Sequence, residues 1–128
     1  MNEIQFTVNG RNLTVTGNPV LTSGSSGSDK CVFTFDSQWS GFSKLIVFST
    51  TDDDEFSAYI IQNQYVIPDE VLRAPGLLKI GVIGLNSAGT VFSTNFLGIK
   101  IITGANGTET VPLALADNMR ALEGGGEE

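Results

Sequence analysis

Histidine is absent from this chain, and that absence narrows the chemistry that its residues could perform. Without histidine there is no Ser-His or Cys-His nucleophile pair, and the commonest zinc ligand is also missing. The one cysteine, Cys31, alternates with the phenylalanines of a strand-like segment, so we interpret it as a buried and inert thiol. A single cysteine forms no disulfide within the chain, which suits folding in a reducing cytoplasm.

Carboxylates are the next candidates for metal binding or acid–base chemistry. The run Asp52-Asp53-Asp54-Glu55 offers oxygen ligands of the kind that calcium prefers. Consecutive side chains on extended backbone point alternately, however, and the spacing and glycine of an EF-hand loop are missing. We therefore favour a solvated turn that protects a strand edge. Asp36, Asp69 and Glu70 stand at expected strand ends and a helix start, where turn and capping roles explain them.

A glycine-rich segment over residues 24–30 superficially resembles a phosphate-cradling loop. It lacks the Gly-Lys-Ser/Thr order, and no helix is expected after it, so we interpret it as a flexible loop. The sequence therefore predicts no catalytic residue, no cofactor-binding residue and no metal ligand. We expect a protein that is not an enzyme and needs no cofactor.

The charge balance bears on possible partners. The net charge is −7 at neutral pH, which disfavours binding to nucleic acid or to an anionic membrane. The start Met1-Asn2-Glu3 has no basic or apolar region of a signal peptide, and no apolar run is long enough to span a bilayer. We expect synthesis in a cytoplasm without a signal peptide. The basic residues form no cluster in the sequence: Arg11, Lys30, Lys44, Arg73, Lys79, Lys100 and Arg120.

The elements around these residues have the pattern of an all-β domain. The chain of 128 residues fits one domain, and apolar residues alternate with polar ones in short runs separated by glycine-rich turns. Residues 3–16 predict a β-hairpin with a type I′ turn at Asn9-Gly10. About eight short strands at regular spacing predict an antiparallel β-sandwich over residues 1–103. The strands are expected at residues 4–8, 11–16, 30–36, 44–50, 56–61, 65–67, 77–84, 90–94 and 96–103.

Two of these segments have distinctive patterns. Residues 44–50 are nearly continuously apolar, which suits a strand that is covered on both faces. Residues 68–72 predict a single helical turn with Pro68 at its first position and acidic residues in the first turn.

The end of the chain differs in composition from the sandwich. Residues 104–110 predict a linker, residues 111–123 a short amphipathic helix, and residues 124–128 a disordered end. The apolar stripe of the helix consists of Val111, Leu115, Met119 and Leu122. A helix of this length is marginal alone in water, so it must dock on something. It either folds back on the domain or pairs with copies of the chain or another partner.

Two loop aromatics, Trp39 and Phe42, have two interpretations. They could form a platform on which a sugar stacks, or they could close one end of the sandwich. We favour closure of the sandwich.

The sequence around Trp39 belongs to a larger set of motifs. They are Phe35-Asp36-Ser37-Gln38-Trp39-Ser40-Gly41-Phe42-Ser43-Lys44 leading into Val47-Phe48, then Val66-Ile67-Pro68-Asp69-Glu70-Val71-Leu72, a Pro-Gly turn, and Leu78-Lys79-Ile80-Gly81-Val82-Ile83-Gly84. In this order they resemble the N-terminal β-sandwich domain of tail and baseplate structural proteins from phages and prophages of Gram-positive and gut bacteria. The resemblance covers about residues 28–103.

The resemblance implies a virion structural module without catalytic residues. It would act by self-association and by docking to other virion proteins, with Val111, Leu115, Met119 and Leu122 as the candidate contact residues. The resemblance also implies that Gly81 and Gly84 relieve crowding where sheets or chains approach closely. The alternative function is a non-catalytic carbohydrate-binding module that uses the aromatics Trp39, Tyr59 and Tyr65.

Overall fold

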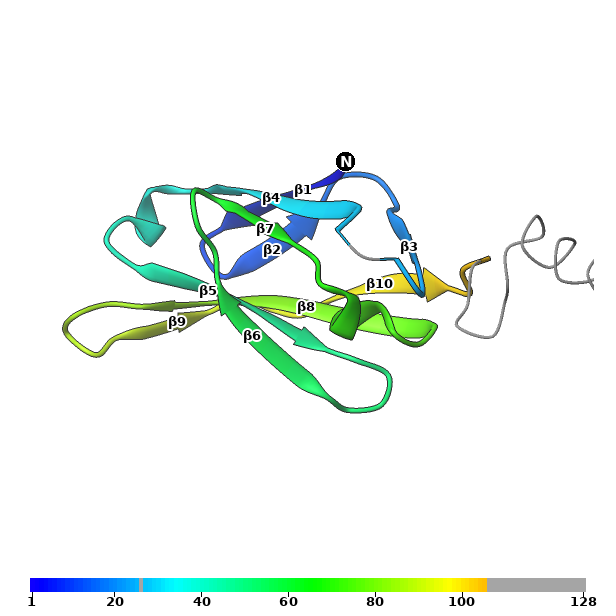
Figure 1. Cartoon of the computed structure of the whole chain (residues 1–128). Helices are drawn as coiled ribbons and strands as arrows, with labels where there is room; N and C mark the ends of the chain where they lie inside the picture. Colours follow the sequence, from blue (N-terminus) through cyan, green and yellow to red (C-terminus); the bar gives the residue numbers. More distant parts are fainter. Residues whose placement is uncertain (26, 106–128) are drawn as a thin grey trace, which may run out of the picture.

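The computed structural model describes residues 1–25 and 27–105, which form a β-sandwich (Figure 1). The all-β prediction is confirmed, with ten strands in place of about eight. The strands are β1 Asn2–Asn9, β2 Asn12–Val15, β3 Val20–Thr22, β4 Asp29–Phe35, β5 Ser43–Ser49, β6 Glu55–Tyr59, β7 Gln64–Val66, β8 Gly76–Leu85, β9 Val91–Ser93 and β10 Leu97–Ile102. Two 3₁₀ turns are present, η1 Ser37–Trp39 and η2 Asp69–Leu72.

The strands form two sheets that pack face to face (Figure 1). Sheet A has the order β2-β1-β4-β7, and sheet B has the order β3-β10-β8-β5-β6 with β9 also paired to β8. Most neighbours are antiparallel, but β1 pairs with β4 and β3 pairs with β10 in parallel. The strand β3 was not expected from the sequence, and its partner is some eighty residues away in the chain.

The core lies between the two sheets and follows the period-two alternation of the strands. In β1 the residues Ile4, Phe6 and Val8 are buried, while those between them are exposed. In β8 the buried hydrophobic residues are Leu78, Ile80 and Val82. Burying such side chains contributes roughly 1.5–3 kcal/mol each, so this inner layer stabilises the domain.

The N-terminal hairpin is present, but its turn differs from the expected one. Asn9 pairs with Asn12, so Gly10 and Arg11 are the two central residues, and of these Gly10 alone has positive φ. A type I′ turn needs positive φ at both central positions, so that prediction is wrong. Gln62 and Asn63 both have positive φ, at 54° and 59°, in the two-residue turn between Ile61 and Gln64.

The predicted helical turn near residues 68–72 is present as the 3₁₀ turn η2. Pro68 is its N-cap residue in extended backbone, so Asp69 takes the first position that was expected for the proline. Val71 and Leu72 are buried beneath the turn. The single turn thus connects β7 of sheet A to β8 of sheet B while it adds two side chains to the core.

Of the expected linker at residues 104–110, residues 106–110 lie outside the described residues. The expected helix at 111–123 and the expected end at 124–128 lie wholly outside them. The last strand, β10, ends at Ile102. Within residues 1–25 and 27–105, no helix has the length and apolar character needed to cross a membrane.

Candidate functional site

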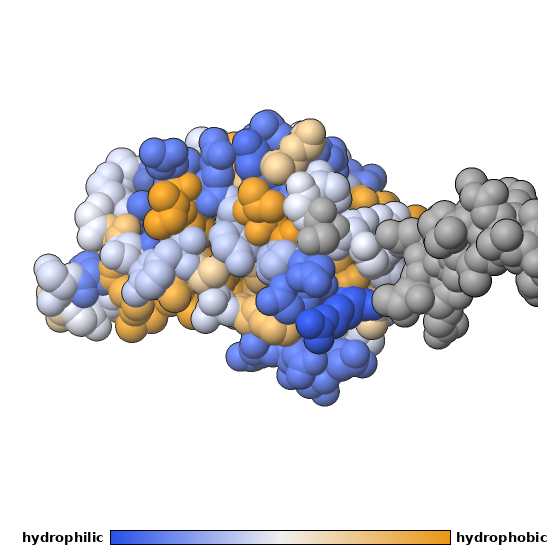
Figure 2. Space-filling model, viewed as in Figure 1, coloured by the Kyte–Doolittle hydropathy of each residue, from blue (hydrophilic) through white to orange (hydrophobic). Residues whose placement is uncertain are grey.

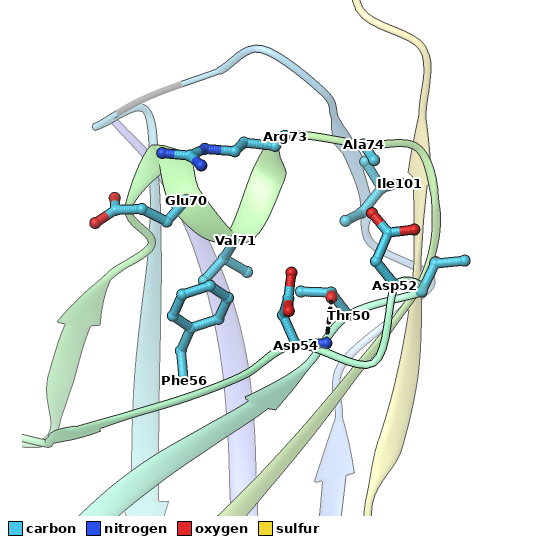
Figure 3. A pocket seen from close by; sticks show the side chains of 10 residues that line it. Thr50, Asp52, Asp54, Phe56, Glu70, Val71, Arg73, Ala74 and Ile101 are labelled. Atoms are coloured by element: carbon cyan, nitrogen blue, oxygen red, sulfur yellow. Dashed lines mark hydrogen bonds between the residues drawn. The ribbon is translucent and has the colours of Figure 1, made fainter.

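The acidic segment lies beside a small pocket between the β5–β6 turn and η2 (Figure 3). The pocket has a volume of about 80 Å³, whereas sites for small organic ligands occupy roughly 300–1,000 Å³. The backbone N–H of Asp54 donates to the Thr50 hydroxyl at 3.2 Å (Figure 3). The lining residues are Thr50, Thr51, Asp52, Asp54, Phe56, Glu70, Val71, Arg73, Ala74 and Ile101.

The carboxylates of this pocket do not converge on one point. Figure 3 shows the side chains of Asp52, Asp54 and Glu70 pointing in different directions. Among the described residues, no group of three or more His, Cys, Asp or Glu side chains could hold a metal ion. The pKa of Asp69 is lowered, first by a side-chain hydrogen bond with Glu70 and further by the charge of Arg73. Asp69 and Glu70 lie in the first turn of η2, as expected, but neither side chain caps it, because the N-cap residue is Pro68 and no side-chain cap bond forms.

Trp39 is completely buried and closes one end of the sandwich, which confirms the favoured interpretation. Its ring packs against Phe35, Phe42 and Phe92, with the nearest centroid, that of Phe92, at 4.8 Å. Its indole N–H donates to the Gly10 carbonyl at 2.8 Å. A ring held in this way presents no face to a sugar.

Two further residues complete this end of the sandwich. The Asp36 carboxylate accepts the backbone N–H groups of Gly10 and Gln38, so it caps η1 and holds the β1–β2 turn at the same time. Gly84 faces the indole, because a Cβ atom there would lie 2.8 Å from a Trp39 ring carbon. The expectation that Gly84 relieves crowding is confirmed at this contact.

Cys31 lies on the inner side of sheet A and is fully buried. The pKa of its thiol is raised from 9.0 to about 12, mainly by burial and also by the negative charge of Asp29. A thiol held in its neutral form is a poor nucleophile. The interpretation of Cys31 as buried is confirmed.

The outer side of sheet B is the most unusual surface of the described domain. Strand alternation directs several large apolar side chains away from the core, and no described element lies over them (Figure 1). Tyr59 is 58% exposed, Phe96 51% and Val91 60%. We define the sheet-B outer face by these residues and their neighbours in register: Leu45, Val47, Tyr59, Leu77, Ile83, Leu85, Val91 and Phe96.

Neighbouring strands bring these side chains into rows. Leu45 pairs with both Tyr59 and Ile83, and Leu85 pairs with Val91, so the rows cross β6, β5, β8 and β9. Figure 2 shows hydrophobic residues reaching the surface on the side of sheet B, next to the hydrophilic β5–β6 turn. Large exposed apolar patches on a folded protein often mark a surface that contacts another molecule.

A shallow depression lies within this face, with a volume of about 170 Å³. Its floor is Gly81, and Phe96 lies across that glycine: a Cβ atom at Gly81 would be 3.1 Å from the Phe96 ring. Val47, Ile83 and Ser93 complete the walls. The absence of a side chain at Gly81 thus lets an aromatic ring lie flat along the sheet.

One end of the sheet-B outer face carries charged residues of both signs, because Lys79 and Glu55 both pair with Ser49 and so lie in one row. Lys79 pairs with Gly98, and Lys100 pairs with Leu77, so the two ammonium groups flank the last apolar residue of the face. Among the described residues, the ion pair between Lys30 and Glu3 lies on sheet A, and no ion pair involves Lys79 or Lys100. The apolar area of the face therefore borders two lysines on one side and the acidic β5–β6 turn next to them.

No known protein-family model matches the chain, and no curated protein matches it. The function must therefore be proposed from the residues and their geometry.

The sequence motifs pointed to Trp39 and Phe42, and the structure brings both into one aromatic cluster. They did not point to the sheet-B outer face. One signal could have found it, the nearly continuous apolar run of residues 44–50, which predicts cover on both faces of β5. In the described residues only the inner side, with Ile46 and Phe48, is fully buried, while Leu45 and Val47 remain half-exposed.

Proposed function

We propose that this protein is a structural component of a phage virion, in the tail or baseplate, and that it acts by self-association and by docking to other virion proteins. The observation that carries the proposed mode of action is the sheet-B outer face. It presents eight large apolar side chains on a regular, rigid sheet, and a surface of that kind is suited to a stable protein contact.

The assignment to a virion rests on the sequence motifs. The segments around Trp39, Pro68 and Gly81 resemble tail and baseplate domains in their order and spacing. Each motif also has a packing role that suits a rigid building block: Trp39 closes the sandwich, and the turn after Pro68 connects its two sheets. A component that transmits or resists force needs such rigidity more than it needs a cleft.

Two measurements test this proposal. Light scattering of the full chain over a range of concentrations should give a defined oligomer. Induction of the prophage in a bacterium that encodes the chain, followed by mass spectrometry of purified particles, should detect the protein in the particle fraction. A monomer at every concentration that is also absent from purified particles would contradict the proposal.

The carbohydrate-binding alternative has weaker support. Of the three aromatics on which it depends, Trp39 is fully buried and Tyr65 packs on Phe48 with a centroid separation of 5.8 Å. Tyr59 is the one that is largely exposed. If the module bound glycans, the original chain would bind on a glycan array and a Tyr59→Ala variant would lose that binding. No binding by the original chain, or binding that the substitution leaves unchanged, would count against this alternative.

A further inference from the structure

The sheet-B outer face is arranged regularly about its strand β5. Three outward residues of β5 each pair with one residue of β8 on one side and one residue of β6 on the other, so three rows cross these strands. Neighbouring strands lie about 4.8 Å apart and successive rows about 6.6 Å apart, so the rows form a grid with β5 along its middle. The rows are Lys79–Ser49–Glu55, Gly81–Val47–Ser57 and Ile83–Leu45–Tyr59.

The two sides of this grid carry opposite charges at one end. Lys79 lies on the β8 side, with Lys100 beyond it on β10. Glu55 lies on the β6 side and follows the three aspartates of the β5–β6 turn. In the part of the chain that the structure describes, neither Lys79 nor Glu55 forms an ion pair. Each of these groups is therefore available to an opposite charge on another molecule.

A second copy of the same face presents those opposite charges in matching places. A half-turn about an axis along β5 keeps each row at its level and exchanges the β8 side with the β6 side. Lys79 of each copy then meets Glu55 of the other copy, and the acidic turn of each copy lies toward the lysine side of the other. A half-turn about an axis across the strands would instead set the charged end of one face against the apolar end of the other.

The side chains of the remaining rows also match in size under this half-turn. Gly81, with the Phe96 ring lying across it, meets the small Ser57 of the other copy, so a bulky group faces a small one. In the next row Ile83 meets Tyr59 of the other copy, which brings two apolar side chains together. Sheets that pack with their strands nearly aligned interdigitate their side chains in this way.

The area of the face is sufficient for a specific contact. The outward residues of β8 from Leu77 to Leu85 extend over about 26 Å, and the five strands from β3 to β6 are together about 19 Å wide. Covering this area on two copies buries roughly 1,000 Å² in total, which reaches the size expected of a specific protein interface.

We propose that two copies of the chain pair through their sheet-B outer faces as a two-fold symmetric dimer, with the axis along β5. The apolar rows form the centre of the contact, and two ion pairs between Lys79 and Glu55 lie at its charged end. This inference rests on the proposed self-association and specifies its surface and its symmetry. Because the ion pair occurs twice, one substitution changes two contacts.

Charge reversal in the full chain tests this arrangement. Lys79→Glu sets two carboxylates against each other at both sites, and Glu55→Lys does the same with two ammonium groups. Each variant should raise the dissociation constant of the dimer by at least about tenfold, measured by light scattering over a range of concentrations. The matched controls are Lys30→Glu and Glu3→Lys, which make the same charge changes on sheet A and should leave that constant within about threefold.

Mixing the two face variants tests the symmetry. When Lys79→Glu and Glu55→Lys chains are mixed, both sites combine opposite charges, so a one-to-one complex should form with nearly the affinity of the original dimer. The fluorescence of Trp39, which is buried at one end of the sandwich, should be the same in all variants and so reports that each of them is folded. Folded variants that stay monomeric in the mixture would overturn the two-fold arrangement.

The same measurements separate this inference from the proposed function. If the full chain is an oligomer and Lys79→Glu leaves its molar mass unchanged, self-association stands and the inference fails. Equal weakening by Lys30→Glu also overturns the inference, because the effect would then come from net charge and not from this face. A full chain that is monomeric at every concentration contradicts the proposed self-association itself, and the inference with it.

Discussion

The outer faces of the two sheets differ sharply although they belong to one small domain. On sheet A the outward residues are mostly polar, as with Gln5, Thr7 and Thr34, and Lys30 is paired with Glu3 at 3.3 Å. On sheet B the outward residues are mostly apolar, and its lysines have no ion pair among the described residues. Sheet A thus has the inward-apolar, outward-polar alternation of a sheet with one solvated face, while sheet B has the apolar composition of a sheet covered on both sides.

The fold of the domain requires one apolar layer, and the second apolar layer, on the outer side of sheet B, is the feature on which the proposed self-association rests. The inner layer accounts for the fully buried core. Large apolar side chains on the outer side add little to the stability of an isolated sandwich. Their place in the sequence is explained if another polypeptide covers them.

The largest expected effect comes from comparing the two sides of one strand, β8. Ile80→Ala removes a fully buried side chain and should lower the free energy of unfolding by about 2–5 kcal/mol. Ile83→Ala, on the outer side, should lower it by less than half as much in the monomeric chain, because Ile83 is half-exposed. Urea denaturation of both variants measures the difference. Equal losses would mean that the outer side is already buried.

The next effect concerns the connection between the two sheets. The Asn95 side chain accepts the Leu13 N–H at 2.8 Å and donates to the Leu13 carbonyl at 3.3 Å. Leu13 lies in β2 at the edge of sheet A, and Asn95 lies between β9 and β10 of sheet B, so these two bonds join the sheets. Asn95→Ala should lower the free energy of unfolding by about 1–3 kcal/mol, since both backbone groups lose their partner. Asn18→Ala, an exposed loop change, is the control and should have little effect. An unchanged midpoint for Asn95→Ala would show that water replaces the amide.

The sequence predicted much of the fold and less of the candidate site, for physical reasons. Alternation in β1 and β4 specifies their inner faces locally, and Pro68 marks the start of η2. The strand β3 has three residues, too few for a periodic signal, and its pairing with β10 depends on the assembled sheet. The bonds of Asn95 likewise depend on a residue far away in the sequence, so nothing near it in the chain indicates them.

The sheet-B outer face was hidden from sequence reasoning for a related reason. Its members come from β5, β6, β8 and β9 and from the residue before β10, and only the strand register places them on one side. The apolar run of residues 44–50 predicted that both faces of this strand are covered, but it did not indicate which element or partner covers the outer face.

A separate effect should follow from pH, through the inner side of sheet A. The pKa of the Cys31 thiol is raised to about 12 by burial and by Asp29, whereas the unfolded chain loses this proton near pH 9. The native state therefore holds the proton more tightly. Its contribution to stability is fully present below about pH 9 and is lost as the pH rises toward 12, at up to about 1.4 kcal/mol for each pH unit.

Urea unfolding between pH 8 and pH 11 measures this dependence. A Cys31→Ala variant will have a different baseline stability, but its slope against pH should be shallower than that of the original chain. Lysine and tyrosine groups titrate in both proteins, so the difference between the two slopes isolates the thiol. Identical slopes would show that Cys31 is exposed to solvent in the native state.

The smallest expected effect is on the polar face of sheet A, and it sharpens the comparison between the sheets. Lys30 and Glu3 form a partly exposed ion pair, with 20% and 49% of the two side chains accessible, and such pairs contribute about 0–1 kcal/mol. Lys30→Met should therefore change the free energy of unfolding by less than about 1 kcal/mol and leave the oligomeric state unchanged. Lys79→Met should also leave the stability of the monomeric chain nearly unchanged, but it should weaken self-association of the full chain. If the two substitutions have the same effect in light scattering, Lys79 is no more important for assembly than Lys30. The two faces would then differ only in their apolar residues.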